Sequence, residues 1–203
     1  MTLLRRAVDR ALEMPLVYAA WQRPVRDAKV RPFLARVDVR TVGRVLDVGC
    51  GPGTNAPLFR EADYVGVDIN PAYIATAQRR HRGRFVVADV SDPAAFPEER
   101  FDCIFVNSLL HHLDDATVAH LMTRLAALTT PTGRIHILDL ILPSEASAAR
   151  ALALADRGRY PRPREAWEAL FRSVLRVEHV APYDVGLPGL PLWRMLYVVG
   201  AAP

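Results

Sequence analysis

The sequence contains little cysteine and no long apolar run. Only two of its 203 residues are cysteines, and Cys50 and Cys103 lack the spacing of metal ligands. We expect both to be small packing residues rather than a disulfide or part of a metal site. No apolar run approaches the roughly 20 residues that span a bilayer, and charged residues interrupt the apolar N-terminal piece, which argues against a secretion signal. We therefore expect a cytoplasmic protein with no metal.

Two motifs of nucleotide-binding proteins are also missing. Gly49, Gly51 and Gly53 alternate with single residues, a closer spacing than that of a dinucleotide fingerprint. No Gly-Lys-Ser/Thr sequence follows them to form a phosphate loop. Nicotinamide cofactors and ATP are therefore disfavoured.

The net charge of +4 is unevenly distributed. Residues 1–44 contain ten basic and four acidic residues, a net charge of +6, so the remainder carries −2. Such a segment can steer an acidic substrate or touch an anionic membrane, but a solvated helix face is the simpler interpretation, so membrane contact is not expected. Nucleic acid is not an expected partner either, because no array of aromatic residues accompanies the basic ones.

Length and composition indicate one domain. A chain of 203 residues with 51% hydrophobic residues is long enough for one sizeable core and too short for two ordinary domains. We expect a single domain over residues 1–203. Its first part, 1–42, has a helical pattern broken by prolines, and 43–203 forms the core, as a monomer or a homodimer.

The glycines follow a short apolar run. Val45, Leu46 and Val48 show no helical spacing, which predicts a strand buried on both faces that ends at Gly49. The expected arrangement is a strand, a glycine turn and then a helix. Glycine suits this turn because it accepts positive φ and lets a ligand approach the backbone. The free N–H groups would face an anionic or strongly polar ligand.

Further along, strand and helix patterns alternate five times, which predicts an α/β fold with a doubly wound, mostly parallel sheet. Asn70 and Asp114 are expected to cap helices. Two further helical patterns lie within residues 144–174. The expected strands after the first are residues 64–68, 85–90, 101–106, 134–141, 174–180 and 193–199.

The stretch VLDVGCGPG resembles the first motif of class I S-adenosylmethionine-dependent methyltransferases, of the short type known as the methyltransferase type 11 group. The resemblance covers nearly the whole chain but is specific only over residues 44–140. It implies a Rossmann-like fold of seven strands in the order 3-2-1-4-5-7-6 with the seventh strand reversed, and an N-terminal helical cap over the cofactor. It also implies S-adenosylmethionine as the cofactor and S-adenosylhomocysteine as its product.

Acidic residues at strand ends are the next candidates. Asp68 ends the second strand, 19 residues beyond Gly49, near the distance at which doubly wound folds place an acid against ribose hydroxyls. The resemblance places Asp89 and Val90 beside the adenine. The full set of expected cofactor-binding residues is Asp47, Gly49, Cys50, Gly51, Gly53, Asp68, Ile69, Asp89, Val90 and Asn107.

The fourth strand opens into a loop with two histidines, His111 and His112. Histidine titrates near neutral pH, so either is a candidate general base for an oxygen or carbon acceptor. The alternative is that both are structural, one under the cofactor and one packed on the next helix. A third interpretation needs no base, because methyl transfer from a sulfonium requires little beyond alignment.

The acceptor is the least determined feature. Tyr18 and Gln22 lie on one helical face and are expected to reach the substrate pocket, with core packing as the alternative. Arg157, Arg159 and Tyr160 lie in an arginine-rich stretch that suits an anionic group, with a solvated loop as the alternative. We expect O- or C-methylation of a small molecule with an aromatic, quinone or lipid-like body, with or without an anionic group.

Other activities remain open alternatives. They are a cofactor-bound enzyme that does not methylate, such as a cyclase, and a nucleic-acid or protein methyltransferase. Amino-group enzymes acting on nucleic acids carry an Asn/Asp-Pro-Pro-aromatic tetrad after the fourth strand, whereas this chain has Asn107-Ser108-Leu109-Leu110. Metal-assisted transfer would favour a carboxylate at the end of the fourth strand, where this chain has Asn107. Asp139 alone does not make a metal site.

Overall fold

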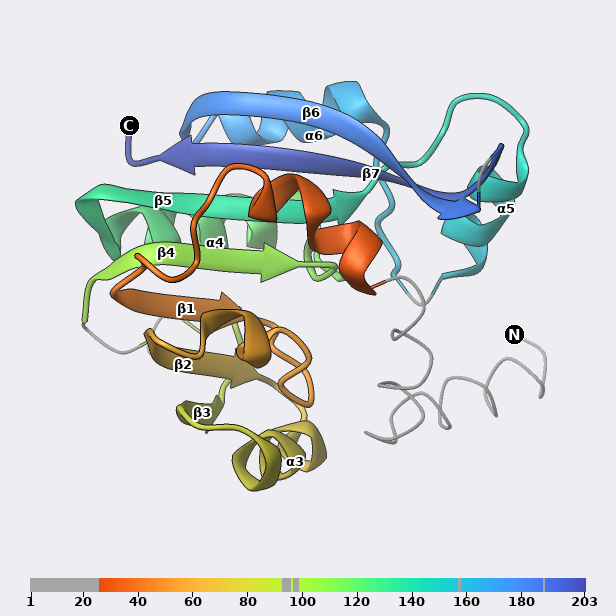
Figure 1. Cartoon of the computed structure of the whole chain (residues 1–203). Helices are drawn as coiled ribbons and strands as arrows, with labels where there is room; N and C mark the ends of the chain where they lie inside the picture. Colours follow the sequence, from red (N-terminus) through yellow and green to blue (C-terminus); the bar gives the residue numbers. More distant parts are fainter. Residues whose placement is uncertain (1–25, 93–95, 97–98, 157, 188) are drawn as a thin grey trace.

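The computed structural model describes residues 26–203 except 93–95, 97–98, 157 and 188. Within these residues, seven strands form one sheet in the order β3-β2-β1-β4-β5-β7-β6 (Figure 1). This is the order that the resemblance implies. The strands are β1 (Arg44–Val48), β2 (Asp63–Asp68), β3 (Arg84–Val87), β4 (Phe101–Asn107), β5 (Thr129–Leu140), β6 (Arg176–Leu187) and β7 (Leu190–Ala201).

Strand direction divides the sheet into two parts. The pairs from β3 through β5 are all parallel, whereas β7 is antiparallel to both β5 and β6. The reversed seventh strand is thus confirmed. Parallel strands place their carboxyl ends at one edge of the sheet, so the ends of β1, β2 and β4 meet there, where ligands of open α/β sheets bind.

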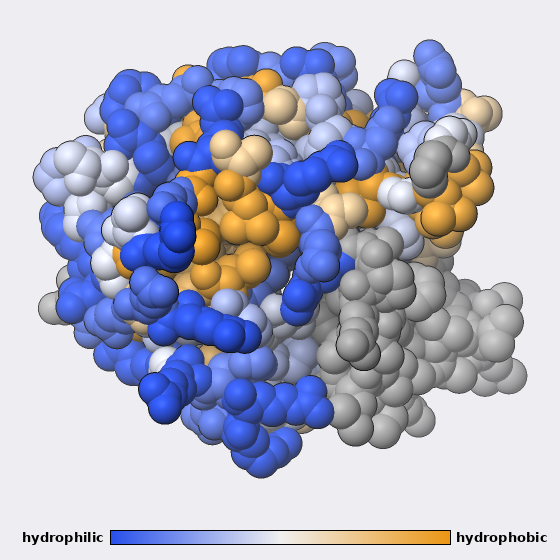
Figure 2. Space-filling view, in the orientation of Figure 1, coloured by the Kyte–Doolittle hydropathy of each residue, from blue (hydrophilic) through white to orange (hydrophobic). Residues whose placement is uncertain are grey.

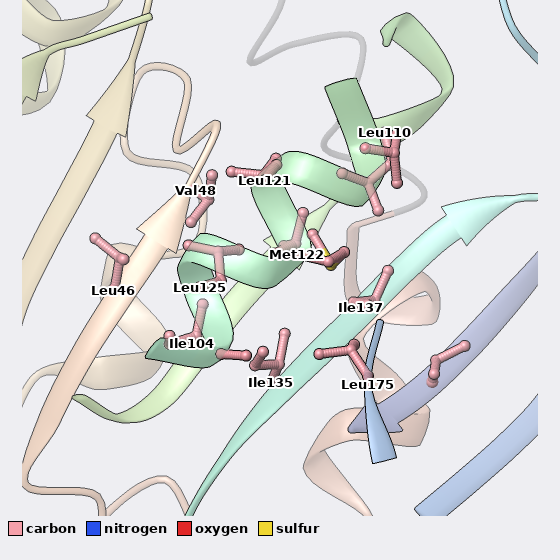
Figure 3. Packing of buried hydrophobic residues seen from close by; sticks show 14 of the residues in the cluster. Leu46, Val48, Ile104, Leu110, Leu121, Met122, Leu125, Ile135, Ile137 and Leu175 are labelled. Atoms are coloured by element: carbon pink, nitrogen blue, oxygen red, sulfur yellow. The ribbon is translucent and has the colours of Figure 1, made fainter. Parts of the chain in front are cut away.

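One face of the sheet is covered by α4 (Asp115–Ala127) and α6 (Arg164–Arg172). Figure 3 shows Leu125 of α4 near Ile104 of β4 and Leu121 of α4 near Val48 of β1. The helix begins where Asp114 accepts a hydrogen bond from the Thr117 N–H at 2.8 Å, as expected for its cap. These buried side chains pack α4 against the sheet.

The opposite face is covered by helical residues 26–34, the 3-10 helix η1 (Ala56–Phe59) and α3 (Pro71–Arg80). Phe33 is fully buried, and its ring meets that of Phe105 edge-on, with centroids 4.8 Å apart. α5 (Ala148–Ala155) packs Ala153 against Met195 of β7. Figure 2 shows a hydrophobic area at the centre of this face, bordered by hydrophilic residues.

Several expected elements have other bounds in the structure, and β5, β6 and β7 are all longer than expected. The helix after the glycine turn is only the single turn η1, because Pro52, Gly53 and Pro57 are poor helix formers. The third strand ends at Val87 rather than Val90. No helix in the described part of the chain is both long and apolar enough to cross a bilayer.

Candidate active site

The glycine turn follows β1 and is hydrogen-bonded to the end of β2. Gly49, Gly51 and Gly53 have φ values of 74°, 56° and 79°, a region that side chains disfavour. A Cβ on Gly49 would lie 3.1 Å from Leu109. The N–H of Gly49 donates to the Val67 carbonyl at 2.8 Å. The turn therefore requires glycine both for its conformation and for its close packing.

Asp68 lies against this turn. One carboxylate oxygen accepts the Gly51 N–H at 2.9 Å, and the other accepts the Asn70 N–H at 2.8 Å. Burial raises the pKa of Asp68, while these two N–H groups lower it in part. The next residue, Ile69, is 62% exposed at the strand end. The structure thus brings together the glycines and the acid expected to bind the ribose, with an apolar side chain beside them.

Asp47 is fully buried beneath the turn. Its Oδ2 accepts a hydrogen bond from the Tyr64 hydroxyl at 2.5 Å. Burial raises the pKa of Asp47 to about 7, although Tyr64 and Asn55 oppose that shift. Among the described residues, Asp47 Oδ1, Thr54 Oγ1 and Asn55 Oδ1 are buried without a hydrogen-bond partner. Such oxygens favour a ligand that brings N–H donors or a positive charge.

The other expected cofactor-binding positions lie along the same edge. Asp89 is exposed beyond the end of β3 and accepts hydrogen bonds from the Ser91 N–H and hydroxyl at 2.9 and 2.7 Å. Val90 is partly buried against the core. Cys50 is buried, as is Cys103, and both are free thiols whose pKa is raised by burial.

Asn107 is the last residue of β4 and lies close to Lys29. Sequence analysis does not predict Lys29 as a site residue. Lys29 Nζ donates to Ser108 Oγ at 3.2 Å, and Ser108 Oγ in turn donates to Asn107 Oδ1 at 3.2 Å. Ser108 has a φ of 55°, an uncommon value for a residue other than glycine. A hollow opens here, lined by Arg26, Lys29, Gly49, Cys50, Thr54, Asn55, Asn107 and Ser108.

His111 lies between two carboxylates. Its Nδ1 is 2.6 Å from Asp139 Oδ1, and its Nε2 is 3.1 Å from Asp156 Oδ1. Burial alone would lower the pKa of His111, but Asp139 and Asp156 raise it to about 9. Because both ring nitrogens are engaged by carboxylates, this geometry favours the structural alternative for His111 over the general base. The His112 ring lies beside the His111 ring at an interplanar angle of 38°, with centroids 4.3 Å apart. A base role for His112 stays a prediction.

The arginine-rich stretch lies on the histidine loop. Tyr160 N–H donates to the His111 carbonyl at 2.9 Å, and Arg162 donates to the Leu113 carbonyl at 2.7 Å and to Asp115 at 2.6 Å. Tyr160 is 42% exposed, and Arg159 is exposed too. Their binding of an acceptor stays a prediction, while Tyr18, Gln22 and Arg157 lie outside the described residues.

Comparison with known proteins supplies the family. The profile of a methyltransferase domain matches residues 45–133. A trans-aconitate 2-methyltransferase of Methylobacterium nodulans is 31% identical over 184 residues, which cover 85% of this chain and 69% of that protein. The chain belongs to the class I S-adenosylmethionine-dependent methyltransferases. The expected family and its methyl donor are thus confirmed.

Other relatives resemble the chain over a shorter stretch of sequence or only in fold. The uncharacterized methyltransferase Rv0089 of Mycobacterium tuberculosis is 38% identical over 105 residues, 49% of this chain and 52% of that protein. The chain thus matches about half the length of this mycobacterial methyltransferase. The N-methyltransferase NodS of Bradyrhizobium japonicum, solved with S-adenosylhomocysteine, has a TM-score of 0.68 at 16% identity, covering 88% of this chain and 87% of that one.

The described residues of this methyltransferase fit the family's cofactor. Asp68 offers two oxygens at the glycine turn, as a ribose diol requires. The exposed Ile69 offers an apolar surface to a flat ring. The unpartnered oxygens of Asp47, Thr54 and Asn55 suit the ammonium of an amino acid. Lys29 and Asp156 join the site through contacts between residues far apart in the chain, which no local pattern reveals.

Proposed function

We propose that this chain transfers the methyl group of S-adenosylmethionine to an oxygen or carbon atom of a small organic acceptor. The observation that carries the proposal is the hydrogen bond between Asp68 and the Gly51 N–H, at 2.9 Å. It holds a diol-binding carboxylate at the point where positive-φ glycines allow a ligand close to the backbone. Fold similarity alone would not support an activity.

In this proposal each strand end has a separate task. Asp68 pairs with the ribose hydroxyls, and Ile69 packs on the adenine, with Asp89 and Val90 at its edge. Asp47, Thr54 and Asn55 face the amino-acid end of the cofactor, where their unpartnered oxygens accept N–H donors. Asn107 and the loop after β4 border the space next to the methyl group.

The reaction depends mainly on how the acceptor atom is aligned with the methyl group of the cofactor. When bound, S-adenosylmethionine supplies an electrophilic methyl group on a sulfonium, so the protein need only hold an acceptor atom in line with it. His111 is occupied by Asp139 and Asp156 and holds the loop in place rather than taking a proton. An acceptor that is already anionic loses no proton at the methylated atom, so it needs no base.

The acceptor class that we favour is a small carboxylic acid. Relatives named trans-aconitate 2-methyltransferase match the chain over as much as 85% of its length, and the exposed face near the loop carries Arg159. A carboxylate oxygen is a nucleophile at neutral pH, which agrees with a site that uses no base. An acceptor of this class satisfies the anionic group expected from the arginine-rich stretch.

Mass spectrometry tests the proposal. The protein would be incubated with S-adenosylmethionine carrying a deuterated methyl group and a panel of small carboxylic acids, phenols, quinones and lipids. We expect labelled methyl esters from the acids, and much less of them from the Asp68→Ala variant under limiting cofactor. Transfer only to phenols or lipids would overturn the acceptor class, and no transfer to any class, together with no binding of S-adenosylhomocysteine, would overturn the activity.

A further inference from the structure

Two basic residues line the hollow beside the glycine turn. Arg26 and Lys29 lie one helical turn apart, so they project from the same side of the helix. Gly49 and Cys50 of the turn and Asn107 at the end of β4 line the same hollow. The hollow has a volume of about 20 Å³, enough for a single small polar group. A space of this size bordered by two cations suits one end of an anion.

Lys29 is an unusual residue to bury. Lys29 is only 9% exposed. Lysines are rarely buried unless a partner stabilises the charged ammonium. Burial lowers the pKa of Lys29 more than Asp156 and Asp139 raise it. An anion placed in the hollow would therefore stabilise the ammonium and recover part of the cost of its burial.

The surrounding backbone holds Lys29 in place. Nζ donates to Ser108 Oγ, and that hydroxyl is fixed by Asn107. Ser108 adopts its φ of 55° at a strand end next to the glycine turn, and unfavourable backbone conformations of this kind cluster at ligand sites. Tyr183 also donates to the Lys29 carbonyl at 2.8 Å, which ties the helix to β6. The ammonium thus has a fixed position in the wall of the hollow.

We propose that Lys29 and Arg26 form a carboxylate-binding subsite at the glycine turn, with Lys29 as the main contact. This inference rests on the proposed function. Two carboxylates are available to it, the one at the amino-acid end of the cofactor and the one on a carboxylic acid acceptor. Both would pair with the same ammonium through a charge-assisted hydrogen bond.

Binding measurements separate the two sources. Calorimetric titrations would compare S-adenosylhomocysteine with 5′-methylthioadenosine, which keeps the nucleoside but lacks the amino-acid end. Lys29→Met removes the charge and retains much of the apolar stem. If the subsite binds the cofactor, this variant loses roughly 10- to 100-fold in affinity for S-adenosylhomocysteine and little for 5′-methylthioadenosine. Arg26→Gln gives a smaller loss, and Arg31→Gln, an exposed position on the same helix, serves as the control.

The second arm uses the acceptor. If the subsite binds the acceptor, Lys29→Met leaves both nucleoside affinities unchanged and raises the KM of a carboxylic acid but not that of its amide. Retained binding of 5′-methylthioadenosine shows that each variant is folded. Unchanged affinity and unchanged KM in Lys29→Met would overturn the subsite while leaving the proposed function intact. A wild-type protein that binds neither nucleoside would instead overturn the proposed function, and the subsite with it.

Discussion

Carboxylates at the carboxyl edge of the sheet do different work because their surroundings differ. Asp68 is partly exposed and accepts two backbone N–H groups, so it is held at the turn and open to a ligand. Asp139 is 2% exposed and accepts the Leu110 and Leu140 N–H groups, each at 2.7 Å, as well as pairing with His111. In the proposed function the first carboxylate binds the cofactor, whereas the second holds the loop.

Asp68 should therefore control cofactor affinity. Replacing it with Ala leaves a ribose diol unpaired, so we expect a loss of about 1–3 kcal/mol in binding free energy. Asp63→Ala, at the exposed start of the same strand, should change little. Calorimetric titration with S-adenosylhomocysteine measures both variants. Equal affinities for the two would remove the role assigned to Asp68.

Gly51 tests the turn independently of the carboxylate. Gly51→Val would place a β-branched residue at a φ of 56°, where such residues are strained. The turn would shift, and the Gly51 N–H would no longer hold Asp68. We expect the variant to lose most of its affinity for S-adenosylhomocysteine, measured by the same titration, while circular dichroism confirms that the sheet is retained. Wild-type affinity in a folded Gly51→Val would contradict this account of the turn.

His111 should make stability depend on alkaline pH. Its folded pKa of about 9 exceeds its ordinary value of 6.5, so its stabilising contribution is complete below about pH 6.5 and is lost as pH rises through about 9. The difference corresponds to roughly 3 kcal/mol. Urea unfolding of the wild type and of His111→Gln at several pH values between 6.5 and 10 isolates this term. Parallel stability curves for the two proteins would show that His111 is not charged in the fold.

The residues of this site were predictable to different degrees. Asp68 and the glycines lie next to recognisable strands, so their spacing and the resemblance indicate them directly. Lys29 contacts Ser108, 79 residues away in the chain, and Asp156 contacts His111, 45 residues away. No sequence pattern predicts such pairs. Asp139 could have been predicted as a site residue, because it is an acidic residue near the end of a strand that reaches this edge.

At the scale of elements, Arg162 fastens the histidine loop to α4 and α6. It is 7% exposed and donates to the carbonyls of Leu110, Leu113 and Tyr160. Its guanidinium also lies over the Trp167 ring, 4.5 Å from the centroid. The planar group satisfies several oxygens at once, which an ammonium cannot do from one position.

Arg162→Lys should consequently destabilise the protein. Some of these buried carbonyls would lose their donor, and we expect a loss of about 1–3 kcal/mol in the free energy of unfolding. Arg164→Lys is the matched control, because Arg164 is exposed and pairs with Glu168 within one helix, where such pairs contribute about 0.3–0.5 kcal/mol. Urea denaturation measures both. Losses of similar size would mean that Arg162 acts as an ordinary surface charge.

Elements were predicted better than their lengths. Alternating strand and helix patterns indicated the parallel core, and the reversed β7 came from the resemblance alone, since local patterns do not specify strand direction. The helix after the glycine turn is only the single turn η1, which Pro52, Gly53 and Pro57 explain. The low helix propensity of these residues overrides the usual order of strand, turn and helix.

At the scale of the whole molecule, the proposed cofactor site is built from segments that lie far apart in the chain. Helical residues 26–34, the turn after β1 and the end of β4 all border the hollow, so the hollow exists only when these parts are packed together. A ligand that binds there binds the folded chain and not the unfolded one. Binding must then stabilise the entire domain rather than one loop.

S-adenosylhomocysteine should accordingly raise the stability of the wild type by mass action. At a concentration of 100 times its dissociation constant, the expected gain in the free energy of unfolding is about 2.7 kcal/mol. Thermal melts across a ligand series would give a midpoint that keeps rising with the logarithm of ligand concentration. Gly51→Val should show little of this rise at the same concentrations, because its turn does not admit the ligand. If the wild type showed no dependence on ligand, the site would not be linked to the folded state in the way that its construction from distant segments requires.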